Sequence, residues 1–456
     1  MFNIGRSLRL AVILIVGITA SVGARAQDVM QFSLEEAIQY ALSNNYELKS
    51  TRFEEYKARA QANEILSAGY PQINAKGDMT YYVKIPTSLI PAAAFGGTAE
   101  DPPIEVQFGQ PWNITGGFEA SQLIFDGTFF IGIKGSRVFV ELSELETNRS
   151  EEDAALTVSK AYLQVLITQE NLKLLDANIE RLQKLYAETT ALNEAGFAEK
   201  IDVDRLKINL TNLELERANG ARLAQTSLDL LKFQMGIDIH QAVLLTESLE
   251  DYAAIPDNLV EVPYVDPTTR IEYSVLETNR KLQLINKKRF QAGYWPTIYG
   301  FGAYQWNAQR NEFNFFDGKQ PWFPVGTVGL NVSIPIFDGF RKKSQVDQVR
   351  YTLNQIDTQM EMLEQSIQLE VKNTHANMIV AYNNLQSLKR NRDLAQEVFD
   401  VADTKYKEGV GSSLELNDAE SALKEADTNY LRAQFEYLLS RLELSKARGE
   451  FARYHR

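Results

Sequence analysis

The sequence predicts a mainly α-helical protein with a smaller β part, built from two similar halves. The segment Leu-Ile-Phe-Asp-Gly at 123–127 returns as Pro-Ile-Phe-Asp-Gly at 335–339. Each copy closes a segment that alternates apolar and polar residues, and each opens a long helical pattern that ends near Gly196 or Gly409. The intervals Gly127–Gly196 and Gly339–Gly409 differ in length by one residue. Two arms of matched length indicate an internal duplication.

The N-terminal residues 1–26 carry the features of a secretion signal. Arg6 and Arg9 give a positive start, residues 10–20 are apolar, and Ala24-Arg25-Ala26 is a small-x-small cleavage site. The apolar stretch is short for a bilayer span, so an uncleaved anchor is the less favoured alternative. We therefore expect export, with cleavage before Gln27.

The composition excludes several classes of protein. The chain has no cysteine, which rules out disulfides, thiolate metal sites and a lipid-modified N-terminal cysteine. Its net charge of -13 argues against nucleic acid as a partner. The histidines His240, His375 and His455 are scattered, and no zinc-protease, phosphate-loop or nucleophile-elbow motif is present. We expect no enzyme activity, no cofactor and no metal site, and we expect His375 to be a solvated helix residue.

Four segments predict strands, at 72–84, 114–125, 297–306 and 327–334. The first alternates apolar and polar residues over its whole length, which is typical of a transmembrane barrel strand with lipid on one side and water on the other. An amphipathic sheet on a soluble core is the alternative. Residues 85–113 between the first two segments are expected to form a loop. Four strands cannot close a barrel and an open edge is not tolerated in lipid, so membrane insertion would require an oligomer.

The helical patterns predict two hairpins. Ser33 caps a helix that runs toward Pro71. In the long arms, apolar residues recur at alternating steps of three and four, which packs neighbouring helices as in left-handed coiled coils. Each arm turns at a glycine and returns, and residues 237–268 contain three prolines that suit a connector. The predicted organisation is a signal peptide at 1–26, a first repeat at 27–236, a connector or equatorial region at 237–268 and a second repeat at 269–456.

Together these segments resemble the TolC-like outer-membrane efflux proteins, also called outer membrane factors. The resemblance runs from Ser33 to about Arg448 and rests on features that occur in the same order in both halves. These are the strand entries Tyr70-Pro71-Gln72-Ile73 and Tyr294-Trp295-Pro296-Thr297, the two Ile-Phe-Asp-Gly exits and the two glycine turns. No one of them is specific, but their order, spacing and duplication together are.

The resemblance implies a homotrimer that spans the bacterial outer membrane and extends into the periplasm. Each chain would give four strands to a 12-stranded β-barrel in the outer-membrane lipid, and its long α-helical hairpins to an α-barrel. The hairpin tips would meet a periplasmic adaptor (membrane fusion) protein that leads to an inner-membrane pump. The implied function is the passive export channel of a tripartite efflux or type I secretion system, for small molecules or proteins. The rival interpretation, from the arms alone, is a periplasmic coiled-coil tether or structural protein with no pore, which has no use for the alternating segments.

The resemblance also implies candidate residues at the periplasmic entrance. Asp202 follows the first turn, and Glu415 and Asp418 follow the second, where the family places acidic residues that ring the closed entrance. In three chains these carboxylates would converge, so that repulsion or cation binding could bias opening. The same acids also suit helix capping, with Ser412 or Ser413 as the cap, and the two interpretations are compatible.

Further implied residues lie at the turns. Tyr406 matches a family tyrosine that ties the second hairpin to the acid at Asp202, whereas the arginine that assists this tie is replaced by Gly411. This departure predicts a looser or differently latched entrance. The turn glycines, Gly196 and Gly409, should need positive φ. With Phe197, Val410 and Gly411 they are expected to contact the adaptor, and solvent exposure without a partner is the alternative.

Overall fold

The computed structural model describes residues 29–252 and 264–451. The predicted signal peptide and His455 lie outside these ranges. The described residues form two compact units, and each unit takes residues from both halves of the sequence. We call the first the hairpin unit, drawn from Met1–Arg52, Glu146–Tyr273 and Leu363–Arg456, and the second the sheet unit, formed by Phe53–Leu145 and Ser274–Met362.

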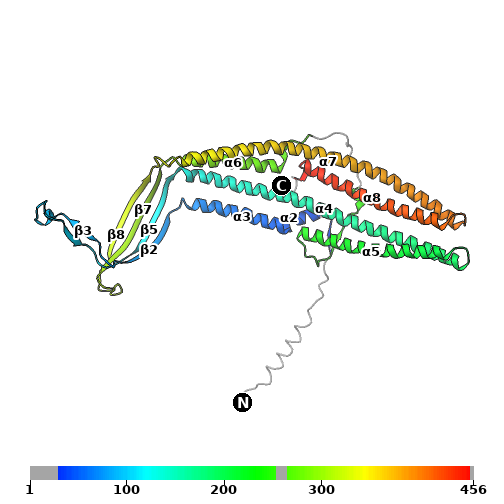
Figure 1. Ribbon diagram of the computed structural model, residues 1–456, viewed down its shortest axis with the longest axis horizontal. Helices are drawn as coiled ribbons and strands as arrows, with labels where there is room; N and C mark the ends of the chain where they lie inside the picture. Colours follow the sequence, from blue (N-terminus) through cyan, green and yellow to red (C-terminus); the bar gives the residue numbers. More distant parts are fainter. Residues whose placement is uncertain (1–28, 253–263, 452–456) are drawn as a thin grey trace, which may run out of the picture. The chain divides into compact units, whose positions relative to one another are not determined.

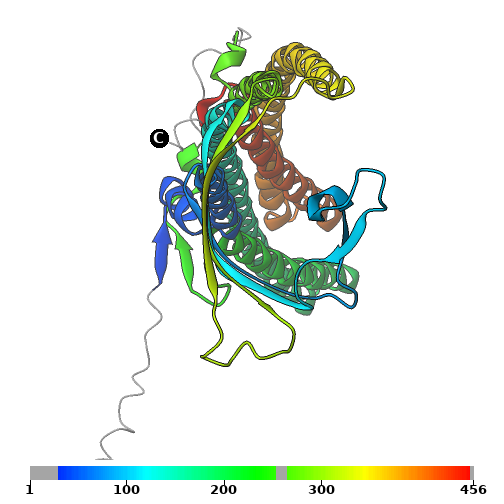
Figure 2. The ribbon, with the colours of Figure 1, turned by 90° about the vertical axis from the view of Figure 1, so that its left-hand side faces the viewer.

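The sheet unit contains all four predicted strands. They are β2 (Gln72–Tyr81), β5 (Trp112–Asp126), β7 (Thr297–Arg310) and β8 (Phe323–Ser333). The spatial order is β2-β5-β7-β8, every pairing is antiparallel (Figure 1), and the sheet is curved (Figure 2). The mainly helical fold class with a strand part is confirmed.

A short β-hairpin, which the sequence did not predict, interrupts residues 85–113. β3 (Thr87–Ile90) pairs antiparallel with β4 (Ile104–Gln107), and a 3-10 turn, η1 (Ala92–Phe95), lies between them. The expectation of a plain loop was wrong for these strands. Each has four residues, which is too short for an alternating pattern to stand out from chance.

The hairpin unit contains two helical hairpins. α4 (Gly127–Glu194) returns as α5 (Lys200–Met235), and α7 (Arg341–Lys407) returns as α8 (Ser413–Ala447); both hairpins turn at the same end of this unit (Figure 1). The first turns of α4 (to Leu145) and of α7 (to Met362), however, belong to the sheet unit. Leucines from α4, α5 and α8 pack with Phe399 of α7 into one buried cluster. Within the described ranges, no helix has the length and apolarity needed to cross a bilayer.

The helix predicted from Ser33 toward Pro71 is in fact two helices, α2 (Leu34–Asn44) and α3 (Tyr46–Ser67). The break is at Asn45, whose Oδ1 accepts hydrogen bonds from the N–H groups of Glu47 (2.8 Å) and Leu48 (3.0 Å). Its Nδ2 donates to the carbonyl of Gln234 (2.6 Å). Asparagine thus caps α3 and binds the end of α5, a long-range contact that helical periodicity does not reveal.

Other elements complete the described chain. β1 (Met30–Phe32) pairs in parallel with β6 (Val243–Leu245), and the connector also holds η2 (Leu249–Tyr252) and η3 (Pro267–Thr269), before α6 (Ile271–Ala292).

His375 corrects one expectation from the sequence. It is buried, with 3% of its surface exposed, so the expectation of a solvated histidine was wrong. Ile367, Val371 and Met378 on α7 are buried as well. His375 continues their spacing of three and four residues, and its position on the packed face of the helix therefore overrides its polarity.

Candidate functional sites: the amphipathic sheet and the hairpin tips

The register of the four-stranded sheet sorts its side chains by polarity. Ile73, Ala120, Gly302 and Val328 lie directly opposite one another in one row across the sheet. The next row, on the other face, contains Asn74, Glu119, Ala303 and Thr327. Directly paired residues share a face. One face is therefore apolar, with Ile73, Ala75, Met79, Tyr81, Ile114, Phe118, Tyr304, Trp306, Val328, Leu330 and Val332, and the other is mostly polar, with Asn74, Lys76, Asp78, Thr80, Asn113, Thr115, Glu119, Ser121, Gln305, Asn307 and Asn331.

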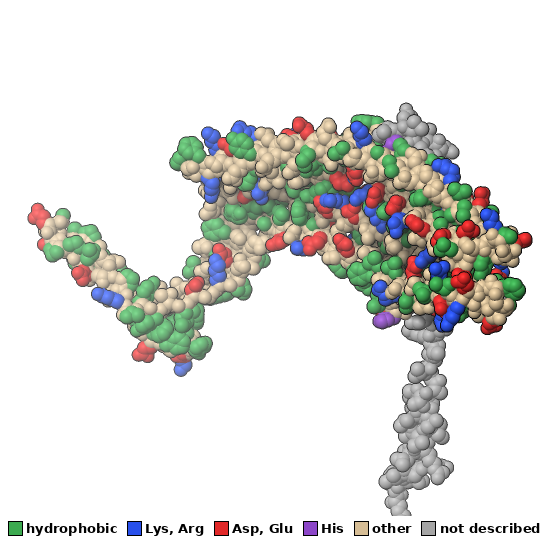
Figure 3. All heavy atoms as spheres, turned by 45° about the vertical axis from the view of Figure 1, so that its right-hand side comes forward, with side chains coloured by type: hydrophobic (Ala, Val, Ile, Leu, Met, Phe, Trp, Pro, Cys, Tyr) green, Lys and Arg blue, Asp and Glu red, His purple; other side chains and the backbone are tan. Residues whose placement is uncertain are grey.

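The apolar face is open to solvent in a single chain. Val328 is 92% exposed, Ile73 71% and Leu330 67%. Hydrophobic side chains also gather on the surface of the sheet unit (Figure 3). At the end of β2, Tyr81 packs on Trp112, and Trp112 packs on Phe313. An apolar surface of this extent is characteristic of contact with lipid or with another chain.

Both predicted glycine turns are confirmed. Gly196 has φ +83° and Gly409 has φ +73°, a conformation that favours glycine. Beside them Phe197 is 84% exposed and Val410 79% exposed. Of the two serines considered as caps, Ser412 holds the cap position of α8, where its Oγ accepts a hydrogen bond from the N–H of Glu415 at 3.1 Å.

The structure divides the candidate entrance residues between two cavities of the hairpin unit. Phe197, Asp202, Tyr406, Gly409 and Gly411 line a cavity of about 720 Å³ between the two turns. Glu415 and Asp418 line a separate cavity of about 620 Å³ on α7 and α8, among valines and alanines. Within one chain, the acids of the two hairpins therefore do not share a site.

Tyr406 ties the hairpins together through a partner that the sequence did not predict. Its Oη lies 3.1 Å from Oγ1 of Thr189, a fully buried residue of α4. Asp202, the partner implied by the resemblance, has its Oδ1 3.9 Å from Nη1 of Arg205 on its own helix. A hydrogen bond therefore joins α7 to the first hairpin, but its partner is a threonine hydroxyl and not the carboxylate of Asp202.

Buried polar atoms surround this tie. In the part of the chain that the structure describes, Ser413 Oγ and Asn417 Oδ1 are buried without a hydrogen-bond partner, and both residues border the same small void as Tyr406 and Thr189. These polar side chains lie at the contact between the two hairpins, around the Tyr406–Thr189 bond.

The turn geometry accounts for Gly411. A Cβ atom at this position would lie 2.9 Å from Cβ of Lys405 and 3.1 Å from the backbone N of Tyr406. The backbone N–H of Gly411 donates to the carbonyl of Lys405 (3.0 Å), which holds the turn against the end of α7. This compact turn leaves no room for an arginine.

A buried polar group between the hairpins was missed from the sequence. Glu420 of α8 is 5% exposed, and burial raises the pKa of its carboxyl, an effect that Arg181 of α4 and Lys424 oppose. The guanidinium of Arg181 also lies 5.0 Å from the ring centre of Phe399 on α7. The only sequence signal is that Glu420 follows a residue of the apolar stripe, Ala419, which is a weak signal in a long charged helix.

Arg270 forms a second buried polar contact. It is 4% exposed and binds Glu272 through two bonds, Nη2–Oε1 at 2.9 Å and Nε–Oε2 at 3.1 Å. Its Nη1 donates to the carbonyl of Ala447 at 2.8 Å and pairs with Glu370 at 3.2 Å. Burial acts to raise the pKa of Glu272, but the bonds from Arg270 outweigh it and hold that pKa below its ordinary value. One guanidinium thus joins the start of α6 to α7 and to the end of α8.

Comparisons with known proteins agree with this geometry. Residues 37–236 and 288–450 match the family model described as outer membrane efflux protein. A probable efflux pump outer membrane protein, TtgC of Pseudomonas putida, is 23% identical over 94% of this chain and 86% of its own length. The outer membrane protein TolC of Escherichia coli is 20% identical over 91% of this chain and 82% of its own length.

Solved structures share the fold. A crystal structure of CusC has a TM-score of 0.70 at 16% identity and covers 91% of each chain. The open-state structure of the MtrE outer membrane channel of Neisseria gonorrhoeae has a TM-score of 0.69 at 19% identity, over 91% of this chain and 88% of that one.

The fold and the amphipathic sheet define a membrane channel subunit that also contains two long helical hairpins. The chain belongs to the outer membrane efflux protein family. It is an outer-membrane channel protein for efflux or secretion, located in the outer membrane and extending into the periplasm, as expected from the sequence. The tether interpretation is therefore not supported.

Proposed function

We propose that three copies of this chain close a 12-stranded barrel and conduct cargo passively from an inner-membrane pump to the exterior. The cargo passes without chemical change, so the chain has no enzymatic role and needs no cofactor. The hairpin tips form the periplasmic entrance and receive an adaptor protein.

The amphipathic sheet with two open edges carries this proposal. In the described chain β2 and β8 each pair on one side only. Because the order is β2-β5-β7-β8 with every pairing antiparallel, β8 of one copy and β2 of the next also run antiparallel when the copies are related by rotation. Closure by identical copies satisfies both edges, directs the apolar face to lipid and encloses the polar face.

The number of copies follows from the width of the barrel. Two copies would give about eight strands, an interior that side chains alone can fill. Three copies are the smallest ring of four-stranded subunits that leaves a wide aqueous path, and the resemblance points to the same number.

The tips supply the entrance and the docking surface. Phe197 and Val410 expose apolar side chains at the two turns, which suits contact with the helical hairpins of an adaptor. Asp202, Glu415 and Asp418 add carboxylates that three copies would bring around one axis, where cations would bind or repulsion would favour opening.

Cysteine cross-linking tests the ring directly, because the natural chain has no cysteine. Single cysteines introduced on the apolar face along β2 are combined with single cysteines along β8, for example Ala75→Cys with Val328→Cys, and oxidised in outer-membrane vesicles. We expect one register of pairs to give a covalent trimer on non-reducing gels. Ala120→Cys on β5, whose neighbours are both in the same chain, is the control and should give none.

Two outcomes would contradict the proposal. A ladder that stops at a dimer or continues to a tetramer would refute the number of copies. A purified protein that forms the covalent trimer but gives no conductance in planar bilayers would refute the open path.

A further inference from the structure

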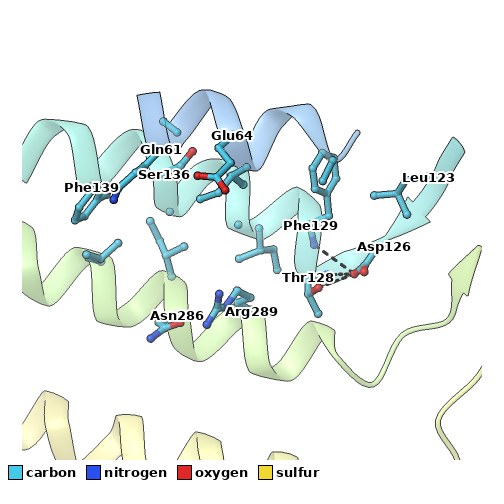
Figure 4. A pocket seen from close by; sticks show the side chains of 18 of the residues that line it. Gln61, Glu64, Leu123, Asp126, Thr128, Phe129, Ser136, Phe139, Asn286 and Arg289 are labelled. Carbon is cyan, nitrogen blue, oxygen red and sulfur yellow. Dashed lines mark hydrogen bonds between the residues drawn. The ribbon is translucent and has the colours of Figure 1, made fainter. Parts of the chain in front are cut away.

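A groove of about 810 Å³ lies in the sheet unit where strands and helices meet. Its floor is the first turns of α4, with Gly132, Gly135 and Ser136, and α3 and α6 form its walls (Figure 4). A Cβ atom added to Gly132 would meet nothing within 4 Å. The glycine floor therefore keeps the groove deep, although glycine lowers helix stability by about 1 kcal/mol relative to alanine.

The groove opens on the polar face of the sheet. Leu123 and Tyr299 line it, and they are directly paired across β5 and β7. The next pair on the same face is Ser121 of β5 with Phe301 of β7, and the pair after it is Glu119 with Ala303. In the proposed channel this face encloses the aqueous path, so the groove faces the lumen; this placement rests on the proposed function.

The lining combines apolar surface with acidic groups. Ile65, Phe129 and Phe139 supply apolar side chains. Glu64 extends its carboxylate from α3 into the groove (Figure 4), and among the described residues no salt bridge involves that carboxylate. Asp126 uses Oδ1 to accept from the N–H and hydroxyl of Thr128 (both 2.7 Å), which fixes its carboxylate at the other end of the groove.

The lining holds one basic residue, Arg289, against two carboxylates, Glu64 and Asp126. Arg289 of α6 borders the groove, but its guanidinium lies 5.2 Å from the ring centre of Phe290. A cation placed over an aromatic face is held there by the ring quadrupole. The two carboxylates outnumber the one guanidinium, so the net formal charge of the lining is negative.

We propose that this groove binds amphipathic organic cations, with their apolar body on the α4 floor and their positive group beside Glu64. The volume suits a ligand of drug size, since such pockets commonly enclose about 300–1,000 Å³. The site is open on one side and its carboxylate is solvated, so binding should be weak and reversible, as a transit site in a conducting lumen requires.

Two isosteric ions of opposite charge provide the test. Tetraphenylphosphonium and tetraphenylborate are titrated calorimetrically into the purified full-length protein in detergent, with empty micelles subtracted. We expect saturable binding of tetraphenylphosphonium and no saturable binding of tetraphenylborate. Glu64→Gln should weaken tetraphenylphosphonium binding by about threefold to fivefold, the factor that one solvated ion pair supports.

A second variant fills the groove without touching a charge. Gly132→Leu should fold, because its Cβ enters open space and leucine is a better helix former, and it should weaken binding at least about tenfold. Glu144→Gln on α4 removes a carboxylate that pairs with Arg59 outside the groove, and its affinity should match the wild type.

Three results would overturn the proposal: equal binding of the two ions, affinity unchanged in both Glu64→Gln and Gly132→Leu, or equal losses in Glu144→Gln and Glu64→Gln. Binding is measured without conduction. A protein that conducts but does not bind refutes the groove alone, and one that binds but does not conduct refutes the channel alone.

Discussion

The Oη of Tyr406 on α7 lies 3.1 Å from Oγ1 of Thr189 on α4, a hydrogen bond that joins the two hairpins next to their turns. Tyr406→Phe removes the bond and keeps the ring. A hydrogen bond of this kind contributes about 1 kcal/mol, so the ratio of closed to open entrance should fall about fivefold. Single-channel recording in planar bilayers should show a higher open probability.

Thr189→Val tests whether the two residues act as a pair. If they do, the double variant should open no more readily than either single variant, because the interaction is already lost. Tyr382→Phe on the same helix is the control and should leave the open probability unchanged. Additive effects of the two single changes would show that the bond does not hold the entrance.

We predict that the turn cannot accommodate arginine in place of Gly411, although the resemblance implies an arginine at this position. Any Cβ there would lie 2.9 Å from Cβ of Lys405, so Gly411→Arg must displace the turn before its guanidinium can reach a partner. We expect raised open probability and faster proteolysis at the turn. Gly318→Arg, at an exposed turn with open space around it, is the matched control for the added charge. A tighter entrance in Gly411→Arg would show that the turn adapts.

The sequence predicted those features that depend on local pattern. Alternation located three of the four long strands, and the ends of the long helical patterns located Gly196 and Gly409. What it missed depends on contacts between distant residues. The break at Asn45 needs the carbonyl of Gln234, and the partner of Tyr406 is fixed by how two hairpins pack, which one chain's periodicity does not specify.

We predict that Glu420 makes the stability of the packed hairpins depend on pH. Burial raises the pKa of its carboxyl despite Arg181 and Lys424, so the folded protein binds its proton more tightly than the unfolded chain does. The contribution to stability is full below the ordinary glutamate pKa and is lost as pH rises through the raised pKa. Glu420→Gln should therefore gain stability relative to wild type as the pH is raised.

Chemical denaturation at a series of pH values measures this difference. Glu425→Gln on the exposed side of α8 should show no such trend. A stability difference between Glu420→Gln and wild type that is constant with pH, or that shrinks as the pH rises, would contradict the assignment.

We predict that the acidic residues near the turns make conduction through the channel sensitive to cations. Asp202→Asn combined with Asp418→Asn removes one carboxylate from each hairpin, and three copies would lose six charges around the proposed entrance. We expect weaker block by divalent or trivalent cations and a changed single-channel conductance. Asp204→Asn, an exposed neighbour of Asp202, is the control. Identical traces in all variants would show that these acids act only in helix capping.

Outside the hydrophobic clusters, we expect the replacement of Arg270 to cause the largest loss of stability of any single substitution. This arginine is 4% exposed and binds Glu272, Glu370 and the carbonyl of Ala447, so Arg270→Ala leaves a half-buried carboxylate and a buried carbonyl without their partner. Removing one member of a buried ion pair costs about 3–5 kcal/mol. Arg448→Ala breaks the exposed pair of Arg448 with Glu450 (3.1 Å) and should cost less than about 1 kcal/mol. Denaturant unfolding of the purified protein compares the two, and equal losses would show that Arg270 acts only as a surface charge.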